Sequence, residues 1–417
     1  MDFEKVSEWI GKHQEEMVEL QAELTSRPAL APENGGTGEW ERARFLEDYV
    51  RRHGLEEVEH YDCPDHRTSE GTRPNIVVTV PGRADKPCIW VLTHLDVVPP
   101  GERAPDGSWK GWDSDPFKVR RVGDVIIGRG VSDNQQSIVS SLFAARALVA
   151  NEVWPPHPVK LLFVADEETG SKYGLLHLLG RHGDMFSHED VIIVPDAGDE
   201  DGSMIEVAEK SVLWLEFRIK GKQAHGSRPD LGINTFRAAA WLVHTLEEGL
   251  KERFDKVDHL YDLPRSTFEP TLHEANVPNV NTIPGEDLFY FDCRVLPSYG
   301  LDSVLAFVQA QCRSADGTYG TTTEISIRNR QDAPRPTPTD ATVVELLKPA
   351  IEEVYGVTPR TMGIGGGTVA APFRAKGFPA AVWMTTGRTA HQVNETCVIA
   401  NMVGDARVFA RVYMSDF

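Results

Sequence analysis

Residues 159–171 read VKLLFVADEETGS, an apolar run that ends in three adjacent carboxylates, Asp166, Glu167 and Glu168. A strand this uniformly apolar is typical of a sheet covered on both faces by helices. Three ionised carboxylates side by side repel one another in a partly dry site unless a cation balances them. A solvated charge run is the alternative, but such runs usually lie on helices or in polar loops. The stretch therefore predicts a buried strand with functional carboxylates at its end.

Similar runs lie on both sides of this stretch and alternate with helical patterns near residues 135–150 and 173–181. The further runs are NIVVTV (75–80), CIWVLTHLD (88–96), VIIGRG (125–130) and DVIIVPDAG (190–198). Apolar strands that alternate with helices predict an α/β sandwich.

The hydrophobic pattern changes near Val212 to strands in which apolar and polar residues alternate, a pattern typical of a sheet with one exposed face. These are VLWLEFRIKG (212–221), PNVNTIPG (278–285), DLFYFDCRVLP (287–297) and TTTEISIRN (321–329), with helices near 234–250 and 301–314. After the Pro-rich segment DAPRPTPTD (332–340), apolar strands again alternate with helices. We therefore predict a catalytic domain formed by residues 1–211 and 331–417, with an α+β domain, residues 212–330, inserted into it.

The overall composition excludes several classes of protein. The 417 residues include 43 basic and 63 acidic side chains, and the net charge of -20 argues against broad binding of nucleic acid or anionic membranes. Five cysteines without CxxC spacing favour a reducing compartment. The charged N-terminal residues are unlike a signal peptide, and we find no apolar stretch long enough to span a bilayer. We expect a soluble cytoplasmic protein.

Five candidate metal ligands each end an apolar run or lie in a Gly-rich turn or polar loop: His94, Asp133, Glu168, Asp196 and His391. Taken singly, three of them have a plainer interpretation: a surface His–Asp pair at residues 94 and 96, a helix N-cap at 133, and an ordinary loop histidine at 391. Carboxyl ends of strands in α/β sheets converge on ligands, so the set together predicts one composite site. It can hold two Zn²⁺, although carboxylate and imidazole also accept Co²⁺ and Mn²⁺.

Six motifs occur in an order that resembles the dinuclear zinc amidohydrolase and peptidase family of carboxypeptidase G, acetylornithine deacetylase, succinyl-diaminopimelate desuccinylase, aminoacylase and the carnosine dipeptidases. They are THLDVVPPG, GRGVSDN, ADEETGS, PDAG, KQAHGSRPDLGIN and NTIPG, and the resemblance extends from about Arg73 to Val403. It implies a zinc-peptidase-like α/β/α sandwich with an inserted ferredoxin-like dimerisation or lid domain.

The resemblance also implies a role for each residue of the site. One metal would be held by His94 and Asp196, the other by Glu168 and His391, with Asp133 bridging them through a carboxylate that precedes a cis peptide bond to Asn134. Asp96, two residues after His94, would orient its imidazole. Glu167 would be the general acid/base.

Further residues would contact the substrate. His225 matches a lid histidine that reaches the partner subunit's active site and stabilises the oxyanion, which implies a homodimer. The residues that would hold a substrate carboxylate are Asn281, Arg294, Gly365, Gly366, Gly367 and Thr368. One segment departs from many relatives: Asn134 to Ser137 replace their Lys-Gly type sequence, so we expect this loop to recognise something different.

We therefore expect a metal-bound hydroxide to cleave the amide bond of an N-acyl amino acid, a small molecule with a free carboxylate. The alternatives are a metallo-exopeptidase of the same family and a non-catalytic descendant that only binds a ligand. The sequence does not identify the acyl group or the amino acid.

Overall fold

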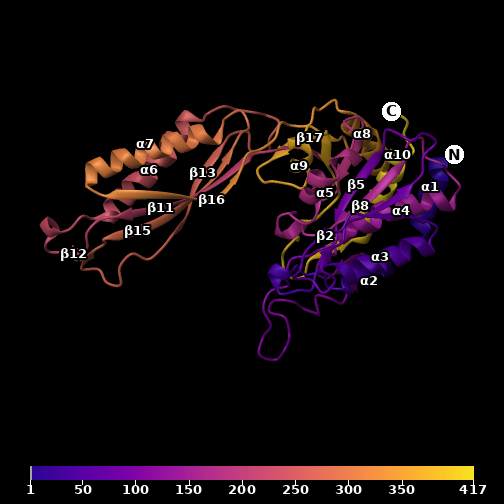
Figure 1. Ribbon diagram of the computed structural model, residues 1–417, viewed down its shortest axis with the longest axis horizontal. Helices are drawn as coiled ribbons and strands as arrows, with labels where there is room; N and C mark the ends of the chain where they lie inside the picture. The colour runs from indigo at the N-terminus through magenta and orange to yellow at the C-terminus, as the bar shows by residue number, and fades with distance from the viewer. Residues whose placement is uncertain (1) are drawn as a thin grey trace. The chain divides into compact units, whose positions relative to one another are not determined.

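A computed structural model describes residues 2–417, which form two compact units (Figure 1). Within the described residues, unit 1 comprises residues 2–207, 337–361 and 368–417, and unit 2 comprises residues 208–336 and 362–367. The glycine-rich segment 362–367 thus packs with unit 2, although the sequence prediction places it in the catalytic domain. The reason is a close approach of backbone to ring, because a Cβ on Gly363 would lie 2.6 Å from the ring of Tyr261.

Unit 1 is built on a mixed sheet whose strand order is β1-β4-β8-β5-β9-β18-β10-β17. Its central strands β8, β5, β9 and β18 run parallel, while β1, β4 and β10 pair antiparallel with their neighbours. The strands are β1 (Glu57–His60), β4 (Ile76–Val80), β5 (Ile89–His94), β8 (Val159–Val164), β9 (Val191–Val194), β10 (Met204–Glu209), β17 (Arg360–Ile364) and β18 (Ala380–Val382). Strands β5 and β9 are buried along their full length, as expected for strands covered on both faces.

Helices cover both faces of this sheet. On one face, α5 and α9 share an apolar core with strands β5, β8 and β9. On the other, α4 packs against β5, β8 and α10. The helices of unit 1 are α1 (Asp2–Lys12), α2 (Gln14–Thr25), α3 (Trp40–Arg52), α4 (Gln135–Ala150), α5 (Leu175–Arg181), α8 (Thr342–Tyr355), α9 (Ala370–Ala375) and α10 (Ile399–Tyr413), with short 3₁₀ turns η1 (Pro32–Asn34), η2 (Glu167–Thr169) and η3 (Gly183–Met185).

The run VIIGRG lies outside the main sheet, contrary to its predicted place among the covered strands. It forms β7 (Val125–Ile127), which pairs with β6 (Arg120–Val122) and β19 (Thr396–Val398). The two-residue turn between β6 and β7 pairs them as a hairpin, and β19 adds a third strand at its other edge. Strands β2 (Cys63–Pro64) and β3 (Thr72–Arg73) form another small ribbon.

Unit 2 has a four-stranded antiparallel sheet, ordered β13-β15-β11-β16, with α6 and α7 packed on one face (Figure 1). The elements are β11 (Ser211–Lys220), α6 (Thr235–Arg253), β13 (Thr267–His273), β15 (Glu286–Val295), α7 (Leu301–Tyr319) and β16 (Thr322–Gln331). A small ribbon pairs β12 (Ala224–His225) with β14 (Thr282–Ile283), and the turn η4 (Pro229–Leu231) follows β12. The rings of Phe217 and Phe289 stack in the core between sheet and helices, with their centroids 4.7 Å apart.

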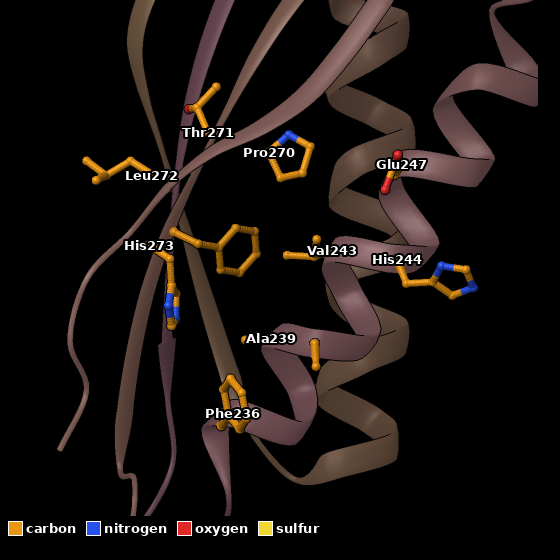
Figure 2. A pocket seen from close by; sticks show the side chains of 11 residues that line it. Phe236, Ala239, Val243, His244, Glu247, Pro270, Thr271, Leu272 and His273 are labelled. Carbon is orange, nitrogen blue, oxygen red and sulfur yellow. The ribbon is translucent and has the colours of Figure 1, made fainter.

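A groove of about 350 Å³ lies between α6 and the edge strand β13 in unit 2 (Figure 2). Its rim carries two half-exposed apolar side chains, Phe236 at 53% and Leu272 at 53% exposure. Figure 2 also shows His273 on this side of β13, where its imidazole lies 2.6 Å from the buried carboxylate of Asp287.

The sequence prediction of an α/β/α sandwich with a separate α+β domain is confirmed, since unit 2 shows the β-α-β-β-α-β order of a ferredoxin-like module. Within residues 2–417, no helix combines the length and the apolar composition required to cross a membrane.

Candidate metal centre

The carboxyl ends of three adjacent parallel strands bring the first ligands together. His94 is the last residue of β5, whose neighbours in the sheet are β8 and β9. Glu167 and Glu168 open the turn η2 just after β8, and Asp196 follows β9 by two residues. Two overlapping groups of possible ligands result, one of His94, Glu167 and Asp196 and one of His94, Asp133 and Glu168, each with ligand atoms within 4.8 Å of one another.

Asp133 lies between the two histidines. Its Oδ1 is 2.9 Å from Nε2 of His94, and its Oδ2 is 2.9 Å from Nε2 of His391. The peptide bond between Asp133 and Asn134 is cis, as the family resemblance led us to expect. Helix α4 begins at Gln135 with Asn134 at the N-cap, so Asp133 is not the cap. Its carboxylate is instead directed to two imidazoles that lie far apart in the sequence.

The second histidine also meets Glu168. Nε2 of His391 lies 3.0 Å from Oε2 of Glu168, and the other oxygen of this carboxylate is buried without a hydrogen-bond partner in the described chain. Unpaired buried carboxylate oxygens are costly, and cation binding removes the cost. The donor set of imidazoles and carboxylates is the one that divalent transition metals prefer, so these residues fit a metal centre.

Asp96 supports two parts of the site at once. Its backbone oxygen is 3.0 Å and its Oδ1 is 3.4 Å from Nδ1 of His94, which leaves Nε2 of that ring to face Asp133. Its carboxylate also accepts hydrogen bonds from the backbone N–H groups of Glu167 and Glu168, both at 3.0 Å. The sequence suggested the first contact and gave no sign of the second.

Asp166 is directed away from the other two acidic residues of its run. Its Oδ1 lies 3.6 Å from the guanidinium of Arg73, and its Oδ2 accepts from the backbone N–H of Tyr173 at 2.9 Å. Asp166 adopts a left-handed conformation, φ 66°, at the N-cap of η2. The three carboxylates are thus divided, because Asp166 is held by the backbone of Tyr173 while Glu168 contacts His391.

Asn134 has a role in the site that the sequence did not indicate. Its side-chain amide donates to Oδ1 of Asp196 at 3.0 Å and to the carbonyl of Pro195 at 2.6 Å. Its Oδ1 accepts from the backbone N–H of His94 at 3.3 Å. Asn134 therefore fixes two of the candidate ligands.

The next three residues do not form a recognition surface, so that expectation is wrong. Gln135, Gln136 and Ser137 are at most 1% exposed. Gln135 accepts from Thr25 at 2.7 Å, and Gln136 donates to the carboxylate of Asp405 at 2.8 Å. These side chains are turned into the protein because α4 is buried on almost all sides.

The carboxylates favour positive charge at the histidines. Hydrogen bonds to Asp133 and Glu168 raise the pKa of His391 to about 10. Burial opposes charge on His94, yet its contacts with Asp133, Asp196 and Asp96 outweigh burial and raise its pKa well above the ordinary value. Burial also opposes charge on Asp133, but hydrogen bonds from both histidines lower its pKa. The centre is thus a concentration of negative charge that attracts cations.

Glu167 differs from Glu168 in having no histidine within hydrogen-bond distance. Its nearest contact with an imidazole is 3.9 Å, from Oε2 to Nε2 of His94. Burial first, and then the negative charges of Asp196 and Glu168, raise the pKa of Glu167 well above its usual value. A carboxyl group with a raised pKa at the edge of a metal site is suited to proton transfer.

In unit 2, two predicted residues lie next to each other. His225 pairs with Thr282 across the ribbon β12–β14, and the carbonyl of Asn281 accepts from the backbone N–H of Gly226 at 2.7 Å, which holds the two segments side by side. The side chain of His225 is exposed, and its Nδ1 lies 2.8 Å from the hydroxyl of Ser227. Unit 2 thus presents His225 and Asn281 together on its surface.

Arg294 forms a fork-shaped pair with a neighbour on the same strand. Its Nε and Nη2 donate to the two oxygens of Asp292 at 2.7 and 2.9 Å, and its Nη1 donates to the carbonyl of Gly365 at 3.1 Å. These contacts tie the glycine-rich segment to the open face of the sheet in unit 2. Gly365 and Gly366 have open space where a Cβ would lie, and the hydroxyl of Thr368 accepts from the N–H of Ala370 at 3.3 Å.

The fold and the centre define a metal-dependent hydrolase, and comparison with known proteins identifies the family. Residues 90–415 match the model of peptidase family M20/M25/M40, and the chain belongs to this family. It is 36% identical over 415 residues to an uncharacterized metallohydrolase of Methanocaldococcus jannaschii, covering 95% of this chain and 98% of that protein. It is 26% identical over 405 residues to a succinyl-diaminopimelate desuccinylase of Methylocella silvestris, and the match covers 96% of this chain and 98% of that protein. The structure of human carnosine dipeptidase 1 shares the fold, with a TM-score of 0.73 and 19% identity. The match covers 99% of this chain and 98% of that one.

Proposed function

We propose that this protein hydrolyses the amide bond of an N-acyl amino acid at a centre of two divalent cations, with Zn²⁺ as the expected metal and Co²⁺ or Mn²⁺ as alternatives. The observation that carries the proposal is the position of Asp133, whose two oxygens each lie 2.9 Å from a different histidine. A carboxylate shared in this way is the bridge that a two-metal site requires.

The ligands divide into two sets around that bridge. His94 and Asp196 would hold one cation, and Glu168 and His391 would hold the other. When bound, such a pair of cations polarises a carbonyl group and lowers the pKa of water, so that the nucleophile forms at neutral pH. The separation of Glu167 from the histidines leaves its carboxylate available for the proton.

Glu167 is assigned the proton transfers. Its carboxylate accepts a proton from the attacking water and delivers it to the leaving nitrogen, general acid/base work that contributes on the order of 10² to 10⁴ in rate. Asp96 positions this residue through the hydrogen bond from the backbone N–H of Glu167 and, at the same time, orients the imidazole of His94. One buried carboxylate thus aligns the proton carrier with a metal ligand.

Residues of unit 2, together with Thr368 of unit 1, are assigned to the substrate carboxylate and the oxyanion. Arg294 keeps donor capacity beyond its pair with Asp292, because a guanidinium has five N–H groups. The open space beside Gly365 and Gly366 suits close approach of a ligand to the backbone, with Gly367, Thr368 and Asn281 completing the set. His225 is assigned to the oxyanion because it is exposed and makes few contacts of its own.

A homodimer is the assembly that we propose, with His225 acting in the partner subunit's active site. The free edge of β13 and the half-exposed Phe236 and Leu272 beside the groove in Figure 2 support an interface in unit 2. Unpaired edge strands readily pair with another chain. We also propose a cytoplasmic location, supported by five buried cysteines that form no disulfide in the described chain.

The experiment is a hydrolysis assay on N-acetyl and N-succinyl amino acids and on dipeptides, with metal content measured in parallel. We expect release of the free amino acid from at least one N-acyl substrate, loss of activity after chelation, and recovery on adding Zn²⁺ or Co²⁺. Cleavage of dipeptides alone would replace the deacylase assignment by an exopeptidase. Absence of turnover by protein that carries two metals would leave only a ligand-binding role.

A further inference from the structure

Glu395 is a buried carboxylate close to the metal centre that the sequence analysis did not single out. It lies four residues after His391, and its side chain is 1% exposed. Burial of an ionised carboxylate is costly unless hydrogen bonds or charges compensate it. The surroundings of Glu395 therefore indicate what the residue does.

Four donors from one segment of chain surround this carboxylate. Oε2 accepts from Nη1 of Arg129 at 2.7 Å and from the N–H of Gly130 at 3.0 Å. Oε1 accepts from the N–H of Ser132 at 2.9 Å and from the N–H of Asp133 at 3.0 Å. Two carboxylate oxygens thus hold three backbone N–H groups and one guanidinium of a single turn.

The turn requires glycine at its centre. Gly130 has φ +80°, and a Cβ there would lie 2.5 Å from Cγ1 of Val97. The backbone therefore curls around the carboxylate in a conformation that only glycine adopts without strain. Arg129 is fixed on its outer side, with its guanidinium 5.1 Å from the ring centroid of Trp112.

The contact joins two parts of the chain that each carry a candidate ligand. Glu395 and Asp133 are 262 residues apart in sequence. The backbone of Glu395 also accepts from the N–H of Gly128 at 3.1 Å, and the chain then continues into β19, which pairs with β7. The loop that presents His391 and the turn that presents Asp133 are therefore fastened to each other at this point.

We propose that Glu395 is a positioning residue of the metal centre, which holds the backbone of Asp133 so that its carboxylate faces both histidines. This inference rests on the proposed two-metal centre. Glu395 has no contact with the ligand atoms themselves, and it acts through the N–H of Asp133. The chemistry that it requires is a charged acceptor with two oxygens, because each oxygen receives two donors.

The test is the variant Glu395→Gln, which keeps the shape but loses the charge and turns an NH₂ group toward donors. Loss of a residue that supports metal ligands costs about 10- to 100-fold in metal affinity. We expect a loss of that size for Zn²⁺, measured by competition with a chromophoric chelator. In the metal-free protein, we expect faster amide hydrogen exchange in the peptide that covers residues 129–134.

A matched control is Glu206→Gln, which alters another buried acidic residue of unit 1. Glu206 pairs with Arg374 at 2.8 Å, and both side chains are at most 1% exposed. This variant should unfold more readily yet bind Zn²⁺ with wild-type affinity and leave exchange in residues 129–134 unchanged. A general effect of removing a buried charge would instead appear equally in both variants and would overturn the inference.

The two proposals fail in distinguishable ways. Wild-type protein that binds none of Zn²⁺, Co²⁺ and Mn²⁺ contradicts the proposed function, while hydrogen exchange in the metal-free protein still decides the role of Glu395. Wild-type affinity and wild-type exchange in Glu395→Gln contradict the positioning role alone. If that variant does not fold, Glu395→Asp takes its place, because it keeps the charge but is one methylene too short to reach all four donors, and it should show the same losses in smaller measure.

Discussion

The candidate ligands of unit 1 and the candidate substrate residues of unit 2 are held in different ways. His94 is 1% exposed, and carboxylates or backbone groups contact both of its ring nitrogens. Asp133 is fixed through its backbone by Glu395. His225, in contrast, is exposed, and its ring lies against a serine of its own turn. The first region is preorganised within one chain, whereas the exposed His225 is expected to gain its further partners from substrate or from another subunit.

The largest effect is expected from Glu167→Gln, which tests the preorganised region. Loss of the proton carrier should lower kcat by roughly 10² to 10⁴. Metal content should stay at the wild-type level, because Glu167 is not one of the five assigned metal ligands. Steady-state kinetics with metal analysis on the same sample checks this, and Glu200→Gln, which alters an exposed carboxylate of unit 1, serves as control. A variant with full activity would remove Glu167 from the mechanism.

His225→Ala tests the exposed region and should have the next largest effect. Loss of one oxyanion donor lowers kcat by roughly 10² to 10³, with no change in metal affinity. The control is His259→Ala, another exposed histidine of unit 2.

Mixed dimers make the same test sharper. If His225 acts in the partner's active site, subunits of His225→Ala and Glu167→Gln that are mixed and allowed to exchange should recover activity, since one site of each mixed dimer has both residues. Absence of recovery from demonstrated mixed dimers would place His225 in its own subunit's site or outside catalysis.

Arg294→Lys should have a smaller effect, confined to substrate binding. A hydrogen bond to a charged group is worth about 1.5–3 kcal/mol, so KM should rise about 10- to 100-fold with little change in kcat. Lysine cannot reproduce the planar fork that also holds Asp292. Arg218→Lys, which alters another ion-paired arginine of the same sheet, should leave KM unchanged. An unaltered KM for Arg294→Lys would exclude it from carboxylate binding.

The smallest expected effect is on the pH dependence of thermal stability in the metal-free protein. Asp133 and Glu168 raise the pKa of His391 to about 10, against about 6.5 in an unfolded chain. The folded state therefore binds this proton more tightly, so the stabilisation is complete below pH about 6.5 and is lost as pH rises through about 10. Thermal unfolding of chelator-treated wild type should show a larger decrease in Tm over this range than His391→Gln. Parallel pH profiles would mean that the imidazole is not charged in the metal-free fold.

Local sequence was enough to predict the α/β/α sandwich, because apolar runs and alternating runs report directly on how many faces of a strand are buried. It was also enough to nominate His94, Glu168 and Asp196, since each follows such a run and the carboxyl ends of parallel strands meet. Local sequence did not predict which polar groups would become hydrogen-bond partners. The N–H of Tyr173 holds Asp166 apart from its two neighbours, and Asn134 and Glu395 secure ligands that lie on other segments.

The predictions that were wrong also depended on contacts between segments that are distant in sequence. VIIGRG pairs in a small separate sheet, the segment 362–367 packs with unit 2, and Gln135 and Gln136 are buried. Burial patterns are local and can be read along the chain. The choice of partner for a polar group depends on which distant segments packing brings within about 3 Å, and only the folded chain settles that.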